Sequence, residues 1–309
     1  MDLHPFRQRT FKQRASLGGI GLHSGSPVRM TLAPAPADSG IVFARSGVEI
    51  PALAEFVVDT NMNTSLGRGP VRIGTVEHLL AALVGCGIDN ARVEVEGPEI
   101  PIMDGSSDPF VALVREAGIH ELRAVRRFLM LRKHVTVGEG DKLARLSPAR
   151  GKFSVSYTVD FQHPLISDQN YKLEMNDRSF QKEICRARTF GFKRDVERLH
   201  RAGLARGGSL ENAVVVDDFN ILNPEGLRFP DEFVRHKILD AIGDLALLGM
   251  PLIGHFTAVK SGHSLNHQLV RKVLAERDAC EVVQPRAADE LNEMQERLLP
   301  LLALEEQVA

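Results

Sequence analysis

The sequence predicts an α+β fold of two similar domains, each layering helices on a mostly antiparallel sheet. Three observations support this prediction. The chain has 309 residues, of which 43% are hydrophobic, a length typical of two domains of about 150 residues each. Strand-like and helix-like periodicities alternate in each half of the chain. One helical pattern occurs twice, because a histidine lies two places after a valine in 76–83 and again in 234–242.

The first predicted domain covers residues 1–125. Alternating or β-branched segments at 28–32, 41–43 and 56–58 predict short strands separated by Gly, Pro, Asp and Ser. We expect a helix at 76–84 that Thr75 opens and two glycines close. A strand at 91–96 and a helix from about 108 to 117 follow. The glycine-rich segment 17–25 lacks both a Gly-Lys-Ser/Thr sequence and the dinucleotide spacing. It therefore predicts a tight turn, in which His23 is structural.

The second predicted domain covers residues 126–285 and follows a charged boundary segment at 121–127. Its periodicity predicts strands at 128–131, 153–161, 213–216 and 253–259, and helices at 180–187, 194–201, 230–248 and 264–276. A β-α-β insert at about 189–216 interrupts the similarity to the first half. Residues 286–309 form a charged, leucine-containing tail for which the sequence predicts no chemistry.

Composition excludes several classes of protein. The chain has 38 basic and 40 acidic residues, a net charge of −2, which argues against nucleic-acid binding. Cys86, Cys185 and Cys280 form neither a disulfide framework nor a Cys-x-x-Cys motif, which favours the reducing cytoplasm. The N-terminus lacks a signal-peptide core, and the longest apolar run, 245–254, is too short to cross a membrane. We therefore expect a cytoplasmic protein without a transmembrane segment. A monomer is a separate expectation, which composition does not decide.

The helix at 230–248 carries an unusual polar row. His236, Asp240 and Asp244 follow one another at i, i+4 and i+8, so they share one face of a helix that is otherwise apolar. Such a helix is expected to be buried, and its polar groups then need hydrogen-bond partners or a metal ion. Taken alone, the row is more typical of a solvated stripe or a buried hydrogen-bonded network than of a metal site.

A histidine of the first half completes a candidate metal site. His78, His236 and Asp240 make a set of two histidines and one carboxylate, and three such ligands are typical of catalytic zinc. Zn²⁺ would polarise a carbonyl group and lower the pKa of a coordinated water to about 7, which suits hydrolysis of an amide or ester. If the two halves pack face to face, this site lies at their seam.

Hydrolysis of an amide also needs a base and an acid. Glu77 is the candidate base, and His263 is the candidate acid, with Asp244 holding and charging its imidazole. Lys237 would add positive charge beside the site. Each of these residues also has a structural interpretation, as a first-turn acid, a helix-start hydrogen bonder, a surface charge or a solvent-facing side chain. No fixed spacing links the two halves of the site.

Seven motifs in combination closely resemble the family of UDP-3-O-acyl-N-acetylglucosamine deacetylases, the zinc amidases of lipid A (lipopolysaccharide) synthesis. The motifs lie at 73–83, 87–90, 99–106, 187–192, 215–218, 228–245 and 260–263. The resemblance runs from about residue 6 to 275. It implies a two-domain fold with the site at the seam, and removal of acetate from the 2-amino group of a UDP-linked, 3-O-acylated glucosamine. The loop 61–70 departs from the family pattern, because Asn63 stands where a cysteine is frequent.

The resemblance also implies a role for each candidate residue. The metal ligands are His78, His236 and Asp240, which would hold one Zn²⁺ per chain, with Fe²⁺ as an alternative. The residues implied for proton transfer and oxyanion stabilisation are Glu77, His263, Asp244, Lys237 and Thr189. For substrate binding, the resemblance implies that Phe190, Phe192 and the insert receive the acyl chain, with Met62 near the same site. It implies that Phe161, Lys142 and Lys260 contact the nucleotide.

Two other functions remain open at this level. One is a zinc amidohydrolase that acts on a different acylated amino sugar. The other is a non-catalytic module that binds a UDP-sugar or an acyl chain. The presence of a full set of candidate ligands, base and acid argues against this second function.

Overall fold

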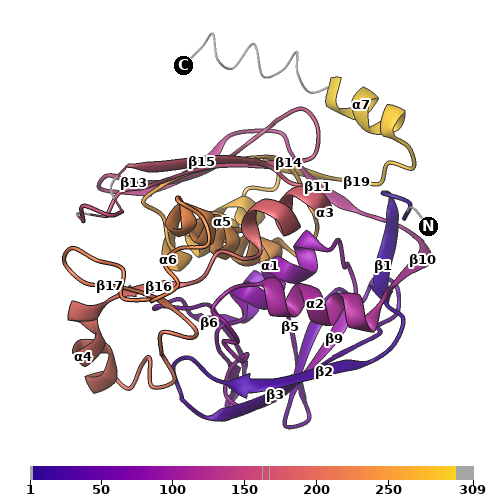
Figure 1. Cartoon of the computed structure of the whole chain (residues 1–309). Helices are drawn as coiled ribbons and strands as arrows, with labels where there is room; N and C mark the ends of the chain where they lie inside the picture. Colours follow the sequence, from indigo (N-terminus) through magenta and orange to yellow (C-terminus); the bar gives the residue numbers. More distant parts are fainter. Residues whose placement is uncertain (1–2, 162, 167, 297–309) are drawn as a thin grey trace.

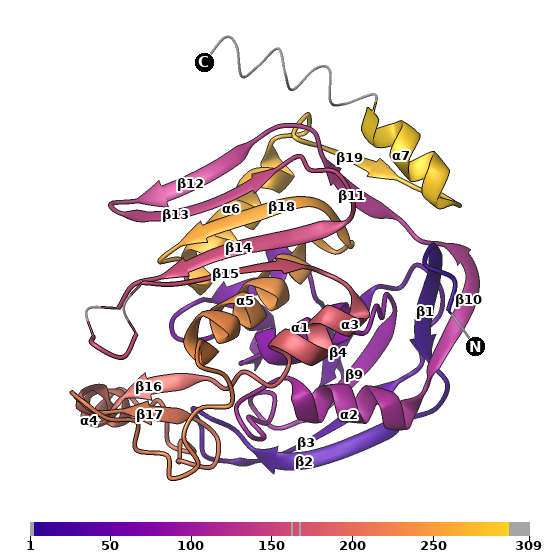
Figure 2. The same cartoon turned by 45° about the horizontal axis from the view of Figure 1, so that its top comes forward.

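The structure is a computed structural model that describes residues 3–161, 163–166 and 168–296. Two main sheets form its outer layers, and helices lie between them (Figures 1 and 2). The inner helices are α1 (Glu77–Gly85), α2 (Asp108–Ala117), α5 (Glu232–Leu245) and α6 (His263–Ala275). This architecture confirms the predicted α+β fold class.

The first main sheet has five strands, and only its β4–β9 pair is parallel. Its order is β2 (Ala15–Ile20), β3 (Pro27–Ala33), β9 (Ala91–Glu96), β4 (Ile41–Arg45) and β5 (Val48–Pro51). Val28, Met30 and Leu32 alternate along β3 and are buried, so one face of the sheet packs against the helices. A smaller sheet of β6 (Val57–Asp59), β7 (Ser65–Arg68) and β8 (Val71–Ile73) then leads into α1.

The second main sheet has seven strands and covers α5 and α6. It contains β11 (Phe128–Leu131), β12 (Val135–Glu139), β13 (Lys142–Ser147), β14 (Phe153–Val159), β15 (Gln169–Glu174), β18 (Leu252–Val259) and β19 (Cys280–Val283). Strand β18 runs parallel to β11 and β14, whereas the other pairs are antiparallel. Alternate residues of β14, from Phe153 to Val159, are buried, as the predicted strand required.

The β-α-β insert is confirmed. β16 (Phe190–Phe192) and β17 (Val214–Val216) pair in parallel, and α4 (Lys193–Arg201) follows β16. The unit lies to one side of the layered helices (Figure 1). Helix α4 begins one residue earlier than the periodicity predicted.

Several boundaries differ from the prediction. The charged segment 121–127 lies largely in β10 (Ile119–Val125), which pairs with β1 (Arg7–Phe11) at one side of the molecule. A two-stranded sheet can carry charged side chains, and Glu121 of β10 forms an ion pair with Arg7 of β1. The predicted helix 180–187 is instead α3 (Asp177–Ser179) followed by a π-helix, η2 (Phe180–Ile184).

The long helix also differs at its ends. It begins at Glu232 and not in the turn after Pro230, and a 3-10 helix, η3 (Ala246–Leu248), extends it to Gly249. In the tail, α7 (Ala288–Glu296) is helical, and residues 297–309 lie outside the described residues. The domain limits at 125 and 285 stay predictions. Within the described ranges, every helix is too short or too polar to cross a bilayer.

Candidate functional site: a metal-ligand set with an acid–base pair

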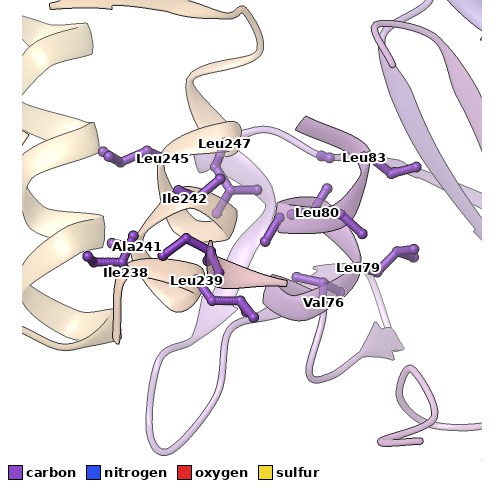
Figure 3. Packing of buried hydrophobic residues seen from close by; sticks show 14 of the residues in the cluster. Val76, Leu79, Leu80, Leu83, Ile238, Leu239, Ala241, Ile242, Leu245 and Leu247 are labelled. Carbon is purple, nitrogen blue, oxygen red and sulfur yellow. The ribbon is translucent and has the colours of Figure 1, made fainter. Parts of the chain in front are cut away.

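Helices α1 and α5 meet at the centre of the molecule. A Cβ atom on Gly243 would lie 2.1 Å from the backbone oxygen of Glu77, so the close approach of the helices requires glycine there. Apolar side chains of both helices, among them Leu80 and Ile242, fill the rest of the interface (Figure 3). This contact brings His78 of the first half within 4.9 Å of His236, measured between ring centroids.

The three candidate ligands converge on a single point. Asp240 Oδ1 lies 3.4 Å from His78 Nε2 and 3.3 Å from His236 Nε2. Ligands held tetrahedrally about 2.0–2.1 Å from a zinc ion are themselves separated by about 3.3–3.4 Å. All three residues are buried, and within the described chain Asp240 Oδ1 has no hydrogen-bond partner. The ligand set therefore fits a metal ion in both spacing and unsatisfied polarity.

The protonation of the ligands also suits metal binding. His236 Nδ1 donates to the backbone oxygen of Ala187 at 3.1 Å, which leaves the Nε2 lone pair free. Burial lowers the pKa of His236 to about 3, so the ring is neutral at pH 7. Burial raises the pKa of Asp240, but its electrostatic interactions with His236 and with the Lys237 ammonium outweigh this effect and keep that pKa well below its usual range. Asp240 is therefore a carboxylate.

Glu77 lies beside this set with the properties of a base. Its side chain is buried, and Oε2 accepts a hydrogen bond from the backbone N–H of Thr64 at 3.0 Å. Burial raises the pKa of Glu77, an effect that His263 and His78 oppose. A carboxylate with a raised pKa takes a proton more readily, so Glu77 is suited to deprotonate water near neutral pH.

His263 is held as an imidazolium. Its Nδ1 donates to Asp244 Oδ2 at 3.0 Å, while Nε2 lies 3.9 Å from Asp240 Oδ2. Burial lowers the pKa of His263, but the charge and hydrogen bond of Asp244 outweigh burial and raise it to about 9. The imidazole is therefore protonated at neutral pH, with its Nε2 proton directed into the site.

Lys237 is not solvent-facing and Asp244 is not a surface charge, contrary to the structural interpretations that the sequence left open for them. The Asp244 side chain is 1% exposed and that of Lys237 is 15% exposed. Lys237 Nζ donates to Asp240 Oδ2 at 2.7 Å. Burial lowers the pKa of Lys237, but Asp240 outweighs burial and raises it above its usual range. Lys237 therefore brings a fixed positive charge to the ligand set.

Sequence reasoning missed two residues that bind the partner of His263, Asp244. Thr64 Oγ1 donates to Asp244 Oδ1 at 2.6 Å, and the Asn266 amide donates to Asp244 Oδ2 at 2.9 Å. Thr64 thus donates hydrogen bonds to both Glu77 and Asp244, the residue that binds His263. The i, i+3 spacing of His263 and Asn266 could have suggested the second contact. The loop around Thr64 has no periodicity that could have suggested the first.

Aromatic rings extend from the ligand set to the insert. Phe190 lies 6.2 Å from His236 and 5.4 Å from Phe161, and Phe161 lies 5.9 Å from Phe192. Phe192 also lines a hollow of about 540 Å³ in the insert, together with Val216 and other residues. The structure therefore brings the three predicted phenylalanines together next to the ligand set.

A buried ion pair fixes the segment before the insert. Arg188 donates from its backbone N–H and from Nε to Glu232 Oε1, both at 2.9 Å. Arg188 lies in the chain between Ala187, whose backbone oxygen accepts the hydrogen bond from His236, and Thr189. The backbone of Thr189 is bound on both sides, to Gly105 at 2.7 Å and to Val214 at 2.8 Å.

The remaining predicted residues lie at the periphery. Lys260 Nζ forms ion pairs with Asp141 and Asp160, both at 2.7 Å, and Asp160 precedes Phe161 in the chain. Lys142 is exposed at the start of β13. Met62 is 52% exposed and lies two residues before Thr64.

Comparison with known proteins gives consistent matches. Residues 8–275 match the family described as LpxC, UDP-3-O-acyl N-acetylglycosamine deacetylase. The chain is 61% identical to the UDP-3-O-acyl-N-acetylglucosamine deacetylase of Myxococcus xanthus over 285 residues, 91% of this chain and 90% of that protein. The protein of the same name from Marinobacter nauticus is 54% identical over 283 residues, 90% of this chain and 93% of that protein.

Proposed function

This chain belongs to the UDP-3-O-acyl N-acetylglycosamine deacetylase family, and from that premise we propose that it hydrolyses the 2-acetamido group of UDP-3-O-acyl-N-acetylglucosamine. The products are acetate and UDP-3-O-acyl-glucosamine, and the reaction is a step of lipid A biosynthesis. The observation that supports this function best is the convergence of the ligand set with Glu77 and a protonated His263 at one point between α1 and α5.

His78, His236 and Asp240 would hold the metal ion. We propose one Zn²⁺ per chain, with Fe²⁺ as the alternative, because two imidazoles and a carboxylate suit both ions. When bound, the ion supplies Lewis acidity, which polarises the substrate carbonyl and lowers the pKa of a water molecule in the site to about 7.

Glu77 acts first, as the base. It accepts a proton from the attacking water as the water oxygen bonds to the acetamide carbon, and the carbonyl π electrons move to the carbonyl oxygen. The tetrahedral intermediate then carries a negative charge on that oxygen. The Lys237 ammonium and Thr189 stabilise this charge, which is larger in the transition state than in the substrate.

His263 completes the reaction, as the acid. Its Nε2 proton passes to the sugar nitrogen while the C–N bond breaks, so the nitrogen leaves as an amine and the carbonyl re-forms in acetate. Asp244 stabilises the imidazolium by accepting the Nδ1–H hydrogen bond, so Nδ1 keeps its proton and Nε2, which faces the site, is the nitrogen that gives its proton up. Thr64 joins the two events, since it binds both Glu77 and Asp244.

The substrate would extend in two directions from this point. We propose that the acyl chain follows the rings of Phe190 and Phe192 towards the insert, with Met62 nearby. The uridine would contact Phe161, and the diphosphate would bind Lys142 and Lys260, with Lys260 exchanging its ion pairs with Asp141 and Asp160 for the anion. We further propose that the enzyme is a cytoplasmic monomer.

An acetate-release assay on three substrates tests this function. We expect turnover of UDP-3-O-acyl-N-acetylglucosamine, with one free amine formed for each acetate. We expect much lower kcat/KM for the same sugar without its acyl chain and for the acylated sugar without UDP. Faster acetate release from another acylated amino sugar would instead support an amidohydrolase of different specificity. Absence of turnover on every sugar, in protein with bound zinc, would support a binding module.

A further inference from the structure

A second cavity lies at the far end of the central helices. It has a volume of about 360 Å³ and is lined by Leu83 and Val84 of α1 and by Leu245 and Ala246 at the end of α5. Glu77 begins α1, whereas these residues end it. At a rise of about 1.5 Å per residue, Leu83 and Val84 lie about 9 to 10 Å from Glu77 along α1. The cavity is therefore separate from the acid–base site.

Both halves of the chain form the apolar walls of this cavity. Ile41 and Leu53 come from the first half, and Phe153, Met175 and Met250 come from the second. Its size lies within the range of small-molecule pockets, which begin at about 300 Å³. A molecule bound there would contact both sides of the seam at once.

Charged residues also line this cavity, at what we call its rim, and not all of them have an ion-pair partner among the described residues. Asp89 pairs with Arg126 at 2.6 Å and Asp38 with Arg127 at 3.5 Å. A third lining carboxylate, Asp177, pairs with Arg9 at 3.0 Å, close behind the rim.

Lys152 is the exception. Lys152 lines the cavity and is exposed, and in the described part of the chain no carboxylate lies within ion-pair distance of its ammonium. Once the three carboxylates are matched with their arginines, the rim keeps one surplus positive charge.

We propose that this cavity is a second ligand site, which binds an amphipathic monoanion such as an aliphatic or aromatic carboxylate. The apolar body lies between the ends of α1 and α5, where it replaces water against Leu83, Leu245 and Met250. The carboxylate faces Lys152, where a charge-assisted hydrogen bond forms without displacing an existing ion pair. Because the ligand contacts both halves, its binding raises the Tm of the protein. This site does not depend on the proposed deacetylase reaction.

Methionine-methyl NMR tests the proposal. The zinc-loaded, full-length protein is labelled with ¹³C-methyl methionine and titrated with decanoate below its micellar concentration. Met175 and Met250 report on this cavity, and Met62 reports separately on the acid–base site. We expect saturable shifts of the Met175 and Met250 signals. Signals of both residues that stay unchanged throughout the titration would overturn the proposal.

Variants test the role of charge and volume. We expect Lys152→Glu to weaken decanoate binding, measured at Met175 and Met250, by about tenfold or more, and to leave decanol binding within about twofold. Lys12→Glu makes the same charge change at an exposed lysine outside the cavity and should leave both affinities unchanged. Equal decanoate affinity in the two variants would overturn the assignment of the carboxylate to Lys152.

A third variant fills the cavity. Ala246→Phe should abolish the decanoate and decanol shifts at Met175 and Met250, because its ring occupies the space between the helix ends. Acetate release should continue at the wild-type rate in Lys152→Glu, which shows that the variant is folded. Retention of both shifts in a folded Ala246→Phe protein would overturn the proposed location of the apolar body.

Discussion

Replacement of Asp244 by asparagine tests how the acid is charged. The variant keeps a side chain of nearly the same shape next to His263 but removes the negative charge that lies 3.0 Å from its Nδ1. The acid donates a proton, so kcat/KM falls as the pH rises past the pKa of His263. A lower pKa therefore moves this descending limb to lower pH.

The size of the change follows from the environment of His263. Its pKa is raised from 6.5 to about 9, and Asp244 is the largest of the groups that raise it. This difference of about 2.5 pH units corresponds to about 3.4 kcal/mol in favour of the imidazolium. Burial, which lowers the pKa, remains in the variant. We expect the limb to move down by about two pH units, which reduces the protonated fraction at pH 8 from about nine-tenths to roughly one-tenth.

The assay measures kcat/KM for acetate release from pH 6 to pH 10, in zinc-loaded protein of each variant. Thr64→Val is the matched control, since it removes the 2.6 Å hydrogen bond to Asp244 Oδ1 and leaves the charge in place. We expect the control to move the limb by less than about one pH unit, as suits the loss of one hydrogen bond. A descending limb at the same pH in Asp244→Asn and wild type would refute the reasoning.

Three further substitutions test the base, the buried ion pair and the helix crossing. Glu77→Gln should keep its zinc, since Glu77 is not in the ligand set, but lose about 10²- to 10⁴-fold in kcat; wild-type turnover would contradict its role as base. Glu232→Ala leaves the Arg188 guanidinium, 2% exposed, without its main partner. Chemical denaturation should show a loss of about 3–5 kcal/mol in the free energy of unfolding. Gly243→Ala should lower the Tm clearly, because its Cβ would lie 2.1 Å from the Glu77 backbone oxygen; an unchanged Tm would contradict the close helix crossing.

Matched controls separate these effects from substitution as such. Asp195→Ala removes an exposed ion pair with Arg198 and should cost at most about 1 kcal/mol. Gly191→Ala adds a Cβ that meets nothing within 4 Å and should leave the Tm nearly unchanged. A loss in Asp195→Ala as large as that in Glu232→Ala would show that burial of the pair is not the cause.

The sequence predicted the parts of the fold that depend on local periodicity. Strand β14 is an example, since alternate residues from Phe153 onwards are buried on one face. Strand β10 was missed because its charged residues suggest a boundary, and its partner β1 lies more than a hundred residues away in the chain. The π-helix at Phe180–Ile184 was also missed, because its sequence pattern does not distinguish it from an α-helix.

In the site, too, the contacts set by local spacing or by the repeated helix pattern were predictable from the sequence, and the other long-range contacts were not. The i, i+4 spacing of His236 and Asp240 fixes their relative positions on one helix, so this part of the ligand set was predictable. The contact with His78 was predicted from the repeated helix pattern and occurs through Gly243. Thr64 reaches Asp244 across 180 positions of sequence, and no periodicity encodes such a contact. Glu232 lies in the first turn of α5, and its main partner, Arg188, comes from another segment that no local pattern points to.

Stepwise addition of zinc to metal-free protein tests most directly the central claim that one metal ion at the seam drives the deacetylation. Acetate release from UDP-3-O-acyl-N-acetylglucosamine is measured after each addition, together with bound zinc by elemental analysis. We predict no activity at the start, a linear rise, and a plateau at about one zinc per chain. His236→Ala should neither retain the ion nor recover activity. Full activity of the metal-free protein, or full zinc retention by His236→Ala, would contradict the account.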